Sequence, residues 1–207
     1  VNFVTDNISK IVENGIIDSK GNLHELDAII YGTGFKTAQF THFRHQSNTS
    51  NSLSNDYIYS IVEDKQGNLW LGTRSGLNHF NTKTKQFTHY LHKDSNANTL
   101  SHDSIYTIIE DSQDNLCVGT RGGLNHFNTQ TRKFSHYRHQ DNNPNSISDD
   151  YVYSIVEDSK DNLWIGTLNG GLNHFNTKTR KFTYYLHHAG DVNTLSHNSI
   201  YSIIEDN

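Results

Sequence analysis

Residues 57–92 read "YIYSIVEDKQGNLWLGTRSGLNHFNTKTKQFTHYLH", and this stretch decides the fold because it returns along the chain. Residues 104–139 read "SIYTIIEDSQDNLCVGTRGGLNHFNTQTRKFSHYRH", and residues 151–187 read "YVYSIVEDSKDNLWIGTLNGGLNHFNTKTRKFTYYLH". A fourth copy, "SIYSIIED", begins at residue 199. The equivalent aspartates are spaced by 47, 47 and 48 residues, at Asp64, Asp111, Asp158 and Asp206. A fixed period of this length predicts an array of equal structural units.

Each copy divides into four short segments, which in the first copy are "IYSIVED", "LWLGT", "LNHFN" and "FTHYLH". They are rich in β-branched and aromatic residues and are separated by turns of Gly, Asn, Asp and Lys, which predicts strands. Four antiparallel strands in about 47 residues make one propeller blade. We therefore predict an all-β fold, a β-propeller fragment with three full blades at about 57–92, 104–139 and 151–188, plus partial or degenerate ones. Residues 199–206 would be the first strand of the next blade.

Composition excludes several classes of function. Only 33% of the 207 residues are hydrophobic, and no apolar run is long enough for a membrane span. The net charge is -5 and no basic block exists, so we expect no nucleic-acid partner. Cys117 is the only cysteine, which excludes an internal disulfide and a cysteine zinc cluster. The chain contains no Met, so we expect a piece of a larger reading frame, and the lack of a signal peptide says nothing about secretion.

The copies resemble the two-component regulator propeller repeat, in which an apolar strand ending in Asp precedes "GNLWIGT" and "GGLN". The first copy matches at Asp64, Asn68, Leu69, Trp70, Gly72, Thr73, Gly76 and Leu77, and the third at Asp158, Asn162, Leu163, Trp164, Gly166, Thr167, Gly171 and Leu172. Cys117 replaces the tryptophan in the second copy, which should loosen that blade. The resemblance covers about residues 36–207. It implies a ligand-sensing module of a hybrid histidine kinase, in the periplasm or outside the cell.

The first 36 residues resemble a different family, the flavin-dependent monooxygenases of the Baeyer–Villiger type. Asp27 is followed by "AIIYGTGF", with Gly32 where that family usually has alanine. A pyrophosphate site needs a third glycine that leads into a helix, and Thr37 stands there instead. We therefore expect no flavin or nicotinamide cofactor. The alternative function is an inactive monooxygenase fragment fused to repeats.

The junction between the two resemblances has a rationale in the sequence. "KTAQFTHFRH" at 36–45 aligns with "KTKQFTHYLH" at 83–92. One hypothesis is that residues 8–45 form a degenerate four-stranded blade, joining the 1–36 fragment to 37–45 of the repeat region 37–207. The alternative is a loose hairpin. The blade hypothesis requires strands within 8–17 and 20–26.

Three blades are too few for an ordinary propeller, so the sequence leaves open how the edges are covered. Further repeats in the parent protein, an open arc of about four blades, and pairing of 199–206 with the first segment, in the same chain or in a partner, are all consistent with it. We expect either additional repeats or self-association at the open blade edges.

We expect no catalytic residues and no metal site. The fourteen histidines repeat at equivalent positions on different blades, which should keep those equivalents apart. The turns "DKQGN", "DSQDN" and "DSKDN" lack the ligand order of a calcium loop, and hairpin turns explain their Asp and Asn.

The expected binding surface lies where the inner strands begin, beside the long loops at 92–104, 139–150 and 187–199. The candidate ligand-binding residues are Tyr59, Asp103, Tyr106, Asp150, Tyr153, Asn198 and Tyr201. Aromatic and hydrogen-bonding groups at a channel mouth would suit a polar ligand such as a glycan. The alternative is that the tyrosines pack between blades and the loops are merely solvated. The sequence therefore favours a non-catalytic sensory module that binds a ligand or a protein.

Overall fold

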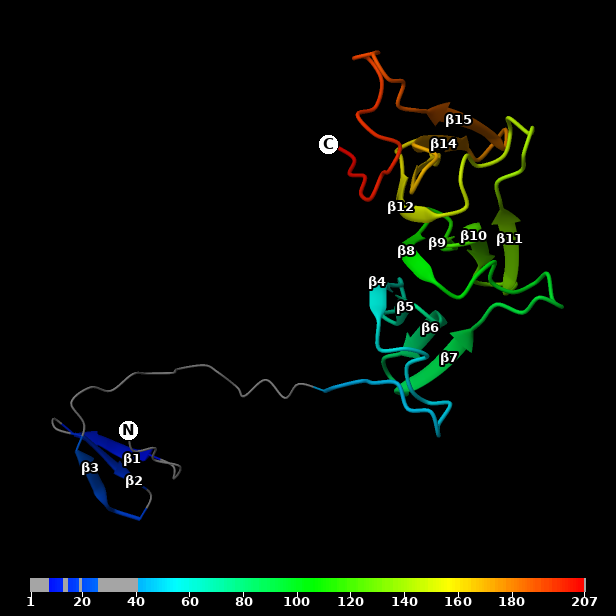
Figure 1. Ribbon diagram of the computed structural model, residues 1–207. Helices are drawn as coiled ribbons and strands as arrows, with labels where there is room; N and C mark the ends of the chain where they lie inside the picture. Colours follow the sequence, from blue (N-terminus) through cyan, green and yellow to red (C-terminus); the bar gives the residue numbers. More distant parts are fainter. Residues whose placement is uncertain (1–7, 13–14, 19, 26–40, 207) are drawn as a thin grey trace. The chain divides into compact units, whose positions relative to one another are not determined.

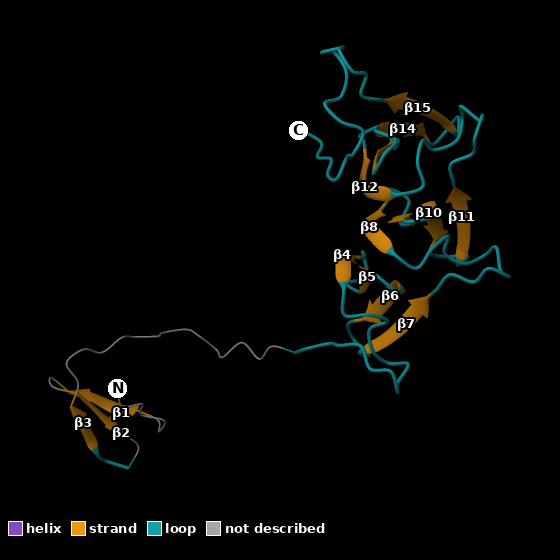
Figure 2. Cartoon of the chain, viewed as in Figure 1, coloured by secondary structure: helices purple, strands orange, loops and turns teal. Residues whose placement is uncertain are grey.

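The computed structural model describes residues 8–12, 15–18, 20–25 and 41–206. Every element in these ranges is a β-strand, which confirms the all-β prediction (Figure 2). The chain divides into two compact units, Val1–His42 and Phe43–Asn207. Each unit is described by itself.

The first unit contains a three-stranded antiparallel sheet in the order β1 (Ile8–Val12), β2 (Gly15–Asp18) and β3 (Leu23–Glu25). The turn before β3 contains Gly21 at a φ of 87°, a conformation that suits glycine. The strands that the degenerate-blade hypothesis requires are therefore present. Its proposed fourth strand lies in 36–45, where residues 36–40 are outside the described residues and residues 41–45 form no strand. The monooxygenase-like motif also lies outside the described residues.

The second unit contains three four-stranded antiparallel sheets, each with its strands in chain order (Figure 1). Blade 1 consists of β4 (Ile58–Glu63), β5 (Leu69–Thr73), β6 (Gly76–Asn81) and β7 (Gln86–Tyr90). Blade 2 consists of β8 (Ile105–Glu110), β9 (Leu116–Thr120), β10 (Gly123–Asn128) and β11 (Lys133–Tyr137). Blade 3 consists of β12 (Val152–Glu157), β13 (Leu163–Thr167), β14 (Leu172–Asn176) and β15 (Lys181–Tyr185). The prediction of three full blades is confirmed.

Neighbouring blades pack through their inner strands, and a glycine of the second strand permits the contact. A Cβ atom on Gly119 of β9 would lie 2.6 Å from Thr107 Cγ2 and 2.7 Å from Val152 Cγ1 of blade 3. Any larger residue would therefore push the next inner strand away. This explains why each repeat carries a glycine before its threonine.

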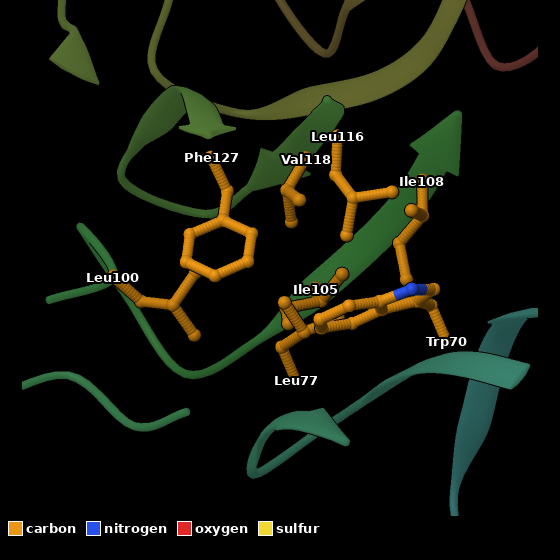
Figure 3. Close-up of a cluster of buried hydrophobic side chains, with 8 residues drawn as sticks. All are labelled: Trp70, Leu77, Leu100, Ile105, Ile108, Leu116, Val118 and Phe127. Atoms are coloured by element: carbon orange, nitrogen blue, oxygen red, sulfur yellow. The ribbon is translucent and has the colours of Figure 1, made fainter. Parts of the chain in front are cut away.

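The best-covered core lies between blades 1 and 2 (Figure 3). Its buried members are Trp70, Leu77, Leu100, Ile105, Ile108, Leu116, Val118 and Phe127. Side chains from two blades and from the loop between them meet there. Burial of one such side chain contributes about 1.5–3 kcal/mol, so blade packing is a main source of stability.

The two ends of the array are less covered than its middle. Ile58 and Ile61 of β4 are 37% and 58% exposed, whereas their equivalents in β8, Ile105 and Ile108, are 0% and 3% exposed. At the other end, Ile200 lies against Gly166 as Val152 lies against Gly119, and its N–H donates to Thr167 O at 2.9 Å. The prediction that residues 199–206 form the first strand of the next blade is wrong for this chain, because a strand needs a full ladder of backbone hydrogen bonds with a neighbour and these residues form none. How the edges are covered in the parent protein stays a prediction.

Candidate functional site

The four candidate tyrosines form a continuous row across the inner strands. The ring centroids of Tyr59 and Tyr106 are 5.9 Å apart, and those of Tyr153 and Tyr201 are 5.3 Å apart. Between these pairs, Tyr106 and Tyr153 stack at 4.4 Å with an interplanar angle of 14°. We call these four residues the tyrosine row. It joins all three blades and the C-terminal segment.

A backbone irregularity positions each tyrosine of the three blades. The register of the β4–β5 pair shifts between Ile58 and Ser60, and the same shift recurs around Tyr106 in β8 and Tyr153 in β12. One extra residue on a strand is a β-bulge, which redirects its side chain and recurs at functional sites. The tyrosine is that extra residue in each blade.

The row is accessible at its ends and half-buried in its middle. Tyr59 is 51% exposed and Tyr201 is 65% exposed. Burial, followed by the neighbouring Tyr153 hydroxyl, raises the pKa of Tyr106. The Arg121 guanidinium lies next to the row, where its Nε donates to Tyr151 Oη at 2.9 Å. The row therefore presents ring faces at its ends and hydroxyl groups beside a cation in its middle.

The other three candidate residues have a structural role in the loops. Asp103 Oδ1 accepts the backbone N–H of His92 at 2.6 Å, and its carbonyl oxygen accepts the N–H of Gly76 at 2.8 Å. Asp150 and Asn198 make the equivalent contacts in the next two loops. These side chains are committed to closing the turns between blades. Binding of a ligand by them stays a prediction.

The histidines at the ends of the outer strands have a similar structural role. His92 Nδ1 bonds to Leu100 O at 2.5 Å, and His139 Nδ1 bonds to Ile147 O at 2.9 Å. His187 and Leu195 repeat this contact. Each of these histidines therefore fixes the start of a loop.

Blades 1 and 3 contain a second repeated group, formed by an aspartate, a tryptophan and a histidine. In blade 1, Trp70 Nε1 donates to Asp64 Oδ2 at 3.2 Å, and the indole lies 4.3 Å from the His79 ring. In blade 3, the corresponding distances are 3.3 Å and 4.4 Å, for Trp164 with Asp158 and His174. The tryptophan thus covers the turn between the first two strands of the blade.

Hydrogen bonds determine the charge state of these aspartates. Burial alone would raise the pKa of Asp158, but the backbone N–H groups of Asn162 and Lys160, with the Asn162 and Trp164 side chains, hold it below its usual value. In blade 2, burial likewise acts upward, while His126 and two backbone N–H groups lower the pKa of Asp111. Both carboxyl groups are ionised at neutral pH.

Blade 2 has no tryptophan at this position, and its side chains are arranged differently. Cys117 is 1% exposed, and burial raises the pKa of its thiol. His126 Nε2 lies 3.0 Å from Asp111 Oδ2, against 3.6 Å for His79 and Asp64 in blade 1. A cavity of about 160 Å³ is lined in part by Asp111, Cys117, His126 and Tyr137, and blade 1 has an equivalent pocket of about 310 Å³ beside Trp70.

This cavity brings together three residues that the sequence reasoning did not connect. One donor atom from each of Asp111, Cys117 and His126 lies within 4.8 Å of the others. The sequence argument compared one repeat position across blades, where equivalents stay apart. A comparison of different positions within blade 2 would have found the group, since Cys117 replaces a tryptophan that lies next to a histidine in the other blades.

Comparisons with known proteins agree with the fold. A family model described as "Two component regulator propeller" matches residues 52–75 and 146–169. The chain is similar to the extracellular domain assigned to the hybrid two-component system BT3049 of B. thetaiotaomicron, with 29% identity and a TM-score of 0.65 over 72% of this chain and 21% of that one. It is also similar to the extracellular domain assigned to the one-component system BT4673 of the same organism, with 25% identity and a TM-score of 0.61 over 83% of this chain and 30% of that one.

The chain thus spans less than a third of the length of either of these domains. A catalytically inactive virginiamycin B lyase of Staphylococcus aureus, in a structure with quinupristin, has 15% identity and a TM-score of 0.50 over 70% of this chain and 44% of that one, which shows a shared fold alone. The comparison with curated proteins gave no match.

Nothing in these comparisons supports the monooxygenase resemblance of residues 1–36. In the part of the chain that the structure describes, no helix could cross a membrane. The second unit is a fragment of a β-propeller that is similar to the extracellular domains of bacterial signalling systems.

Proposed function

We propose that the chain is a non-catalytic sensory module that binds its ligand at the tyrosine row. The observation that carries this proposal is the row itself, because three blades and the C-terminal segment each contribute one ring to it. Equal repeats place equal side chains at regular intervals, so an array of blades can build one continuous binding surface.

The chemistry of the row favours a hydroxyl-rich ligand such as a glycan. Tyr106 and Tyr153 cover each other's faces, so their hydroxyl groups and edges remain for contact. Tyr59 and Tyr201 offer larger exposed ring surfaces at the ends. Polar groups that fix orientation beside apolar ring surfaces are the usual composition of a small-molecule site. We place the module outside the cytoplasm, since both signalling relatives are extracellular domains.

Calorimetric titration of the full chain with a panel of neutral and acidic oligosaccharides tests this proposal. We expect at least one oligosaccharide to bind. Tyr106→Phe removes one hydroxyl group and should weaken that binding about three- to tenfold, as expected for one lost hydrogen bond. Tyr153→Ala should weaken it more, because it also removes the stacked ring.

Tyr57→Ala is the matched control, because Tyr57 is 63% exposed and lies outside the row. It should leave the affinity unchanged. The absence of binding by any oligosaccharide overturns the glycan assignment. Equal affinity of Tyr153→Ala and the unaltered chain overturns the assignment of the site to the tyrosine row.

A further inference from the structure

In each blade, the turn between the first two strands begins with an aspartate, and we call it the aspartate turn. The aspartate turn of blade 2 has a cysteine beside it, where those of blades 1 and 3 have a tryptophan. In blade 1, Asp64 Oδ2 accepts the indole N–H of Trp70. Cys117 stands at the equivalent position of blade 2, so Asp111 Oδ2 has lost that donor. Asp111 Oδ1 still accepts the N–H groups of Gln113 and Asn115, at 3.0 Å and 2.8 Å. The turn is therefore intact, and one carboxylate oxygen faces the cavity.

The strand register fixes the other two donors on the same side of the sheet. Cys117 of β9 and His126 of β10 are directly paired residues, so their side chains project together. Asp111 follows the end of β8, which pairs with β9. Three neighbouring segments of one rigid sheet thus each contribute one donor, and the three donor atoms lie within 4.8 Å of one another.

This spacing is close to what a tetrahedral zinc ion requires. Bond lengths of about 2.0–2.3 Å place zinc ligands roughly 3.5 Å apart, so small side-chain rotations would close the group around an ion. The cavity of about 160 Å³ also has room for a water molecule as the fourth ligand. A zinc ion would replace the hydrogen bond between His126 and Asp111 with two metal bonds.

The charge of the cavity wall favours a cation. Glu157 and Asp161 line the same cavity as Asp111, opposed by Arg180. The Glu157 carboxylate is held by the Ser112 N–H and hydroxyl at 2.8 Å and 2.9 Å, so it remains nearby as a fixed charge. A mixed sulfur, nitrogen and oxygen donor set suits zinc and excludes the hard cations calcium and magnesium.

We propose that Asp111, Cys117 and His126 form a zinc-binding site in blade 2, with water as the fourth ligand. This proposal differs from the expectation, drawn from the sequence, that the chain has no metal site. The ion would take the place of the missing tryptophan and join the ends of three neighbouring segments. It would be specific to this blade, because blades 1 and 3 have no cysteine at the corresponding position.

Cobalt binding to the full chain, under a thiol-free reductant, tests the site. We expect one cobalt ion per chain, with the intense visible bands of tetrahedral cobalt and the near-ultraviolet charge-transfer band of a cobalt–thiolate bond. Zinc should displace the cobalt and abolish both signals. The thiolate band separates this site from binding by the other histidines, since Cys117 is the only cysteine.

Three variants complete the experiment. Cys117→Ser and His126→Gln each remove one ligand and should weaken binding at least tenfold. Cys117→Trp restores the side chain of the other blades and should abolish binding while the strand signal in circular dichroism is kept. A chain that shows no thiolate band with cobalt overturns the proposal. So does an affinity that is unchanged in Cys117→Ser, the variant that alters the fold least.

Discussion

Blade 2 and blade 1 have the same four strands and the same register, yet different side chains lie beside their aspartate turns. In blade 1, Trp70 donates to Asp64 Oδ2 and lines a pocket of about 310 Å³. In blade 2, Cys117 lines the equivalent pocket of about 160 Å³, and His126 is the side chain that bonds to Asp111 Oδ2. The fold tolerates this difference because the backbone ladders and the glycine contact between blades do not depend on the indole. The comparison shows which interactions define a blade and which ones only fill it.

The largest change in the free energy of unfolding should come from removing the indole of blade 1, which the following blade covers. Trp70 is 5% exposed, and its ring contacts Tyr90 and Phe127 at 5.7 Å each. We expect Trp70→Ala to lower the free energy of unfolding by about 3–5 kcal/mol, measured by urea denaturation, because it leaves a cavity and removes the indole donor from Asp64 Oδ2.

Trp164→Ala provides the matched comparison in blade 3. The ring partners of Trp164 in the described chain, His174 and Tyr185, belong to its own blade, and the indole is only partly buried. Its loss should cost about 1–3 kcal/mol. Equal losses for Trp70→Ala and Trp164→Ala would contradict the view that the following blade supplies most of the stabilisation.

A smaller change, this time a gain in the free energy of unfolding, is expected when blade 2 receives the tryptophan of its neighbours. Cys117→Trp fills the cavity and gives Asp111 Oδ2 an indole donor. We expect the free energy of unfolding to rise by about 1–2 kcal/mol in metal-free buffer, as for other cavity-filling changes. A loss of stability would mean that the surrounding side chains have closed the space, so that an indole no longer fits.

The smallest effect concerns pH and the histidine beneath the Trp70 indole. Burial lowers the pKa of His79, although the nearby Asp64 acts in the opposite direction. The hydrogen bond to the Leu100 carbonyl, followed by that to Asp94, raises the pKa of the loop residue His92. Protonation of His79 therefore lowers the free energy of unfolding. This loss grows as pH falls from about 6.5, the pKa in the unfolded chain, towards the lower pKa in the folded chain.

Protonation of His92 changes the free energy of unfolding in the opposite direction. Its stabilising contribution is complete below about pH 6.5 and is lost as pH rises through its higher folded pKa. Titration of the imidazole resonances by NMR should show His92 titrating at higher pH than His79, with His79→Gln used to assign the signal. The reverse order would contradict the assigned environments of both rings.

Repetition made much of the fold predictable from the sequence. The 47-residue period and the four short segments of each copy, with turn residues between them, predicted four strands per unit, and every predicted strand of blades 1 to 3 is present. The tyrosines were predicted to lie where the inner strands begin, and Tyr59, Tyr106 and Tyr153 do so, whereas Tyr201 lies in a segment that forms no strand. Their direct contact depends on the bulge and on blade-to-blade packing, neither of which a single strand reveals.

The sequence did not reveal the contacts that join different repeat positions. Ligand binding by Asp103 stays a prediction, but that prediction did not include the hydrogen bond that the Asp103 carboxylate accepts from a backbone N–H eleven residues earlier. The sequence analysis also compared histidines only between blades, where equivalent positions are far apart. It therefore missed the group that Asp111, Cys117 and His126 form within blade 2.

The sequence by itself determined the period, the strands and the one position where blade 2 departs from its neighbours. Local chain geometry is enough for these, because a strand's pattern and its turns lie within a few residues of one another. Only the tertiary structure decided that an aspartate, a cysteine and a histidine meet at a pocket in this blade. Their meeting depends on the register that pairs Cys117 with His126 and on the position of the turn after β8, and both are set by pairing between strands, which the pattern of one strand does not show.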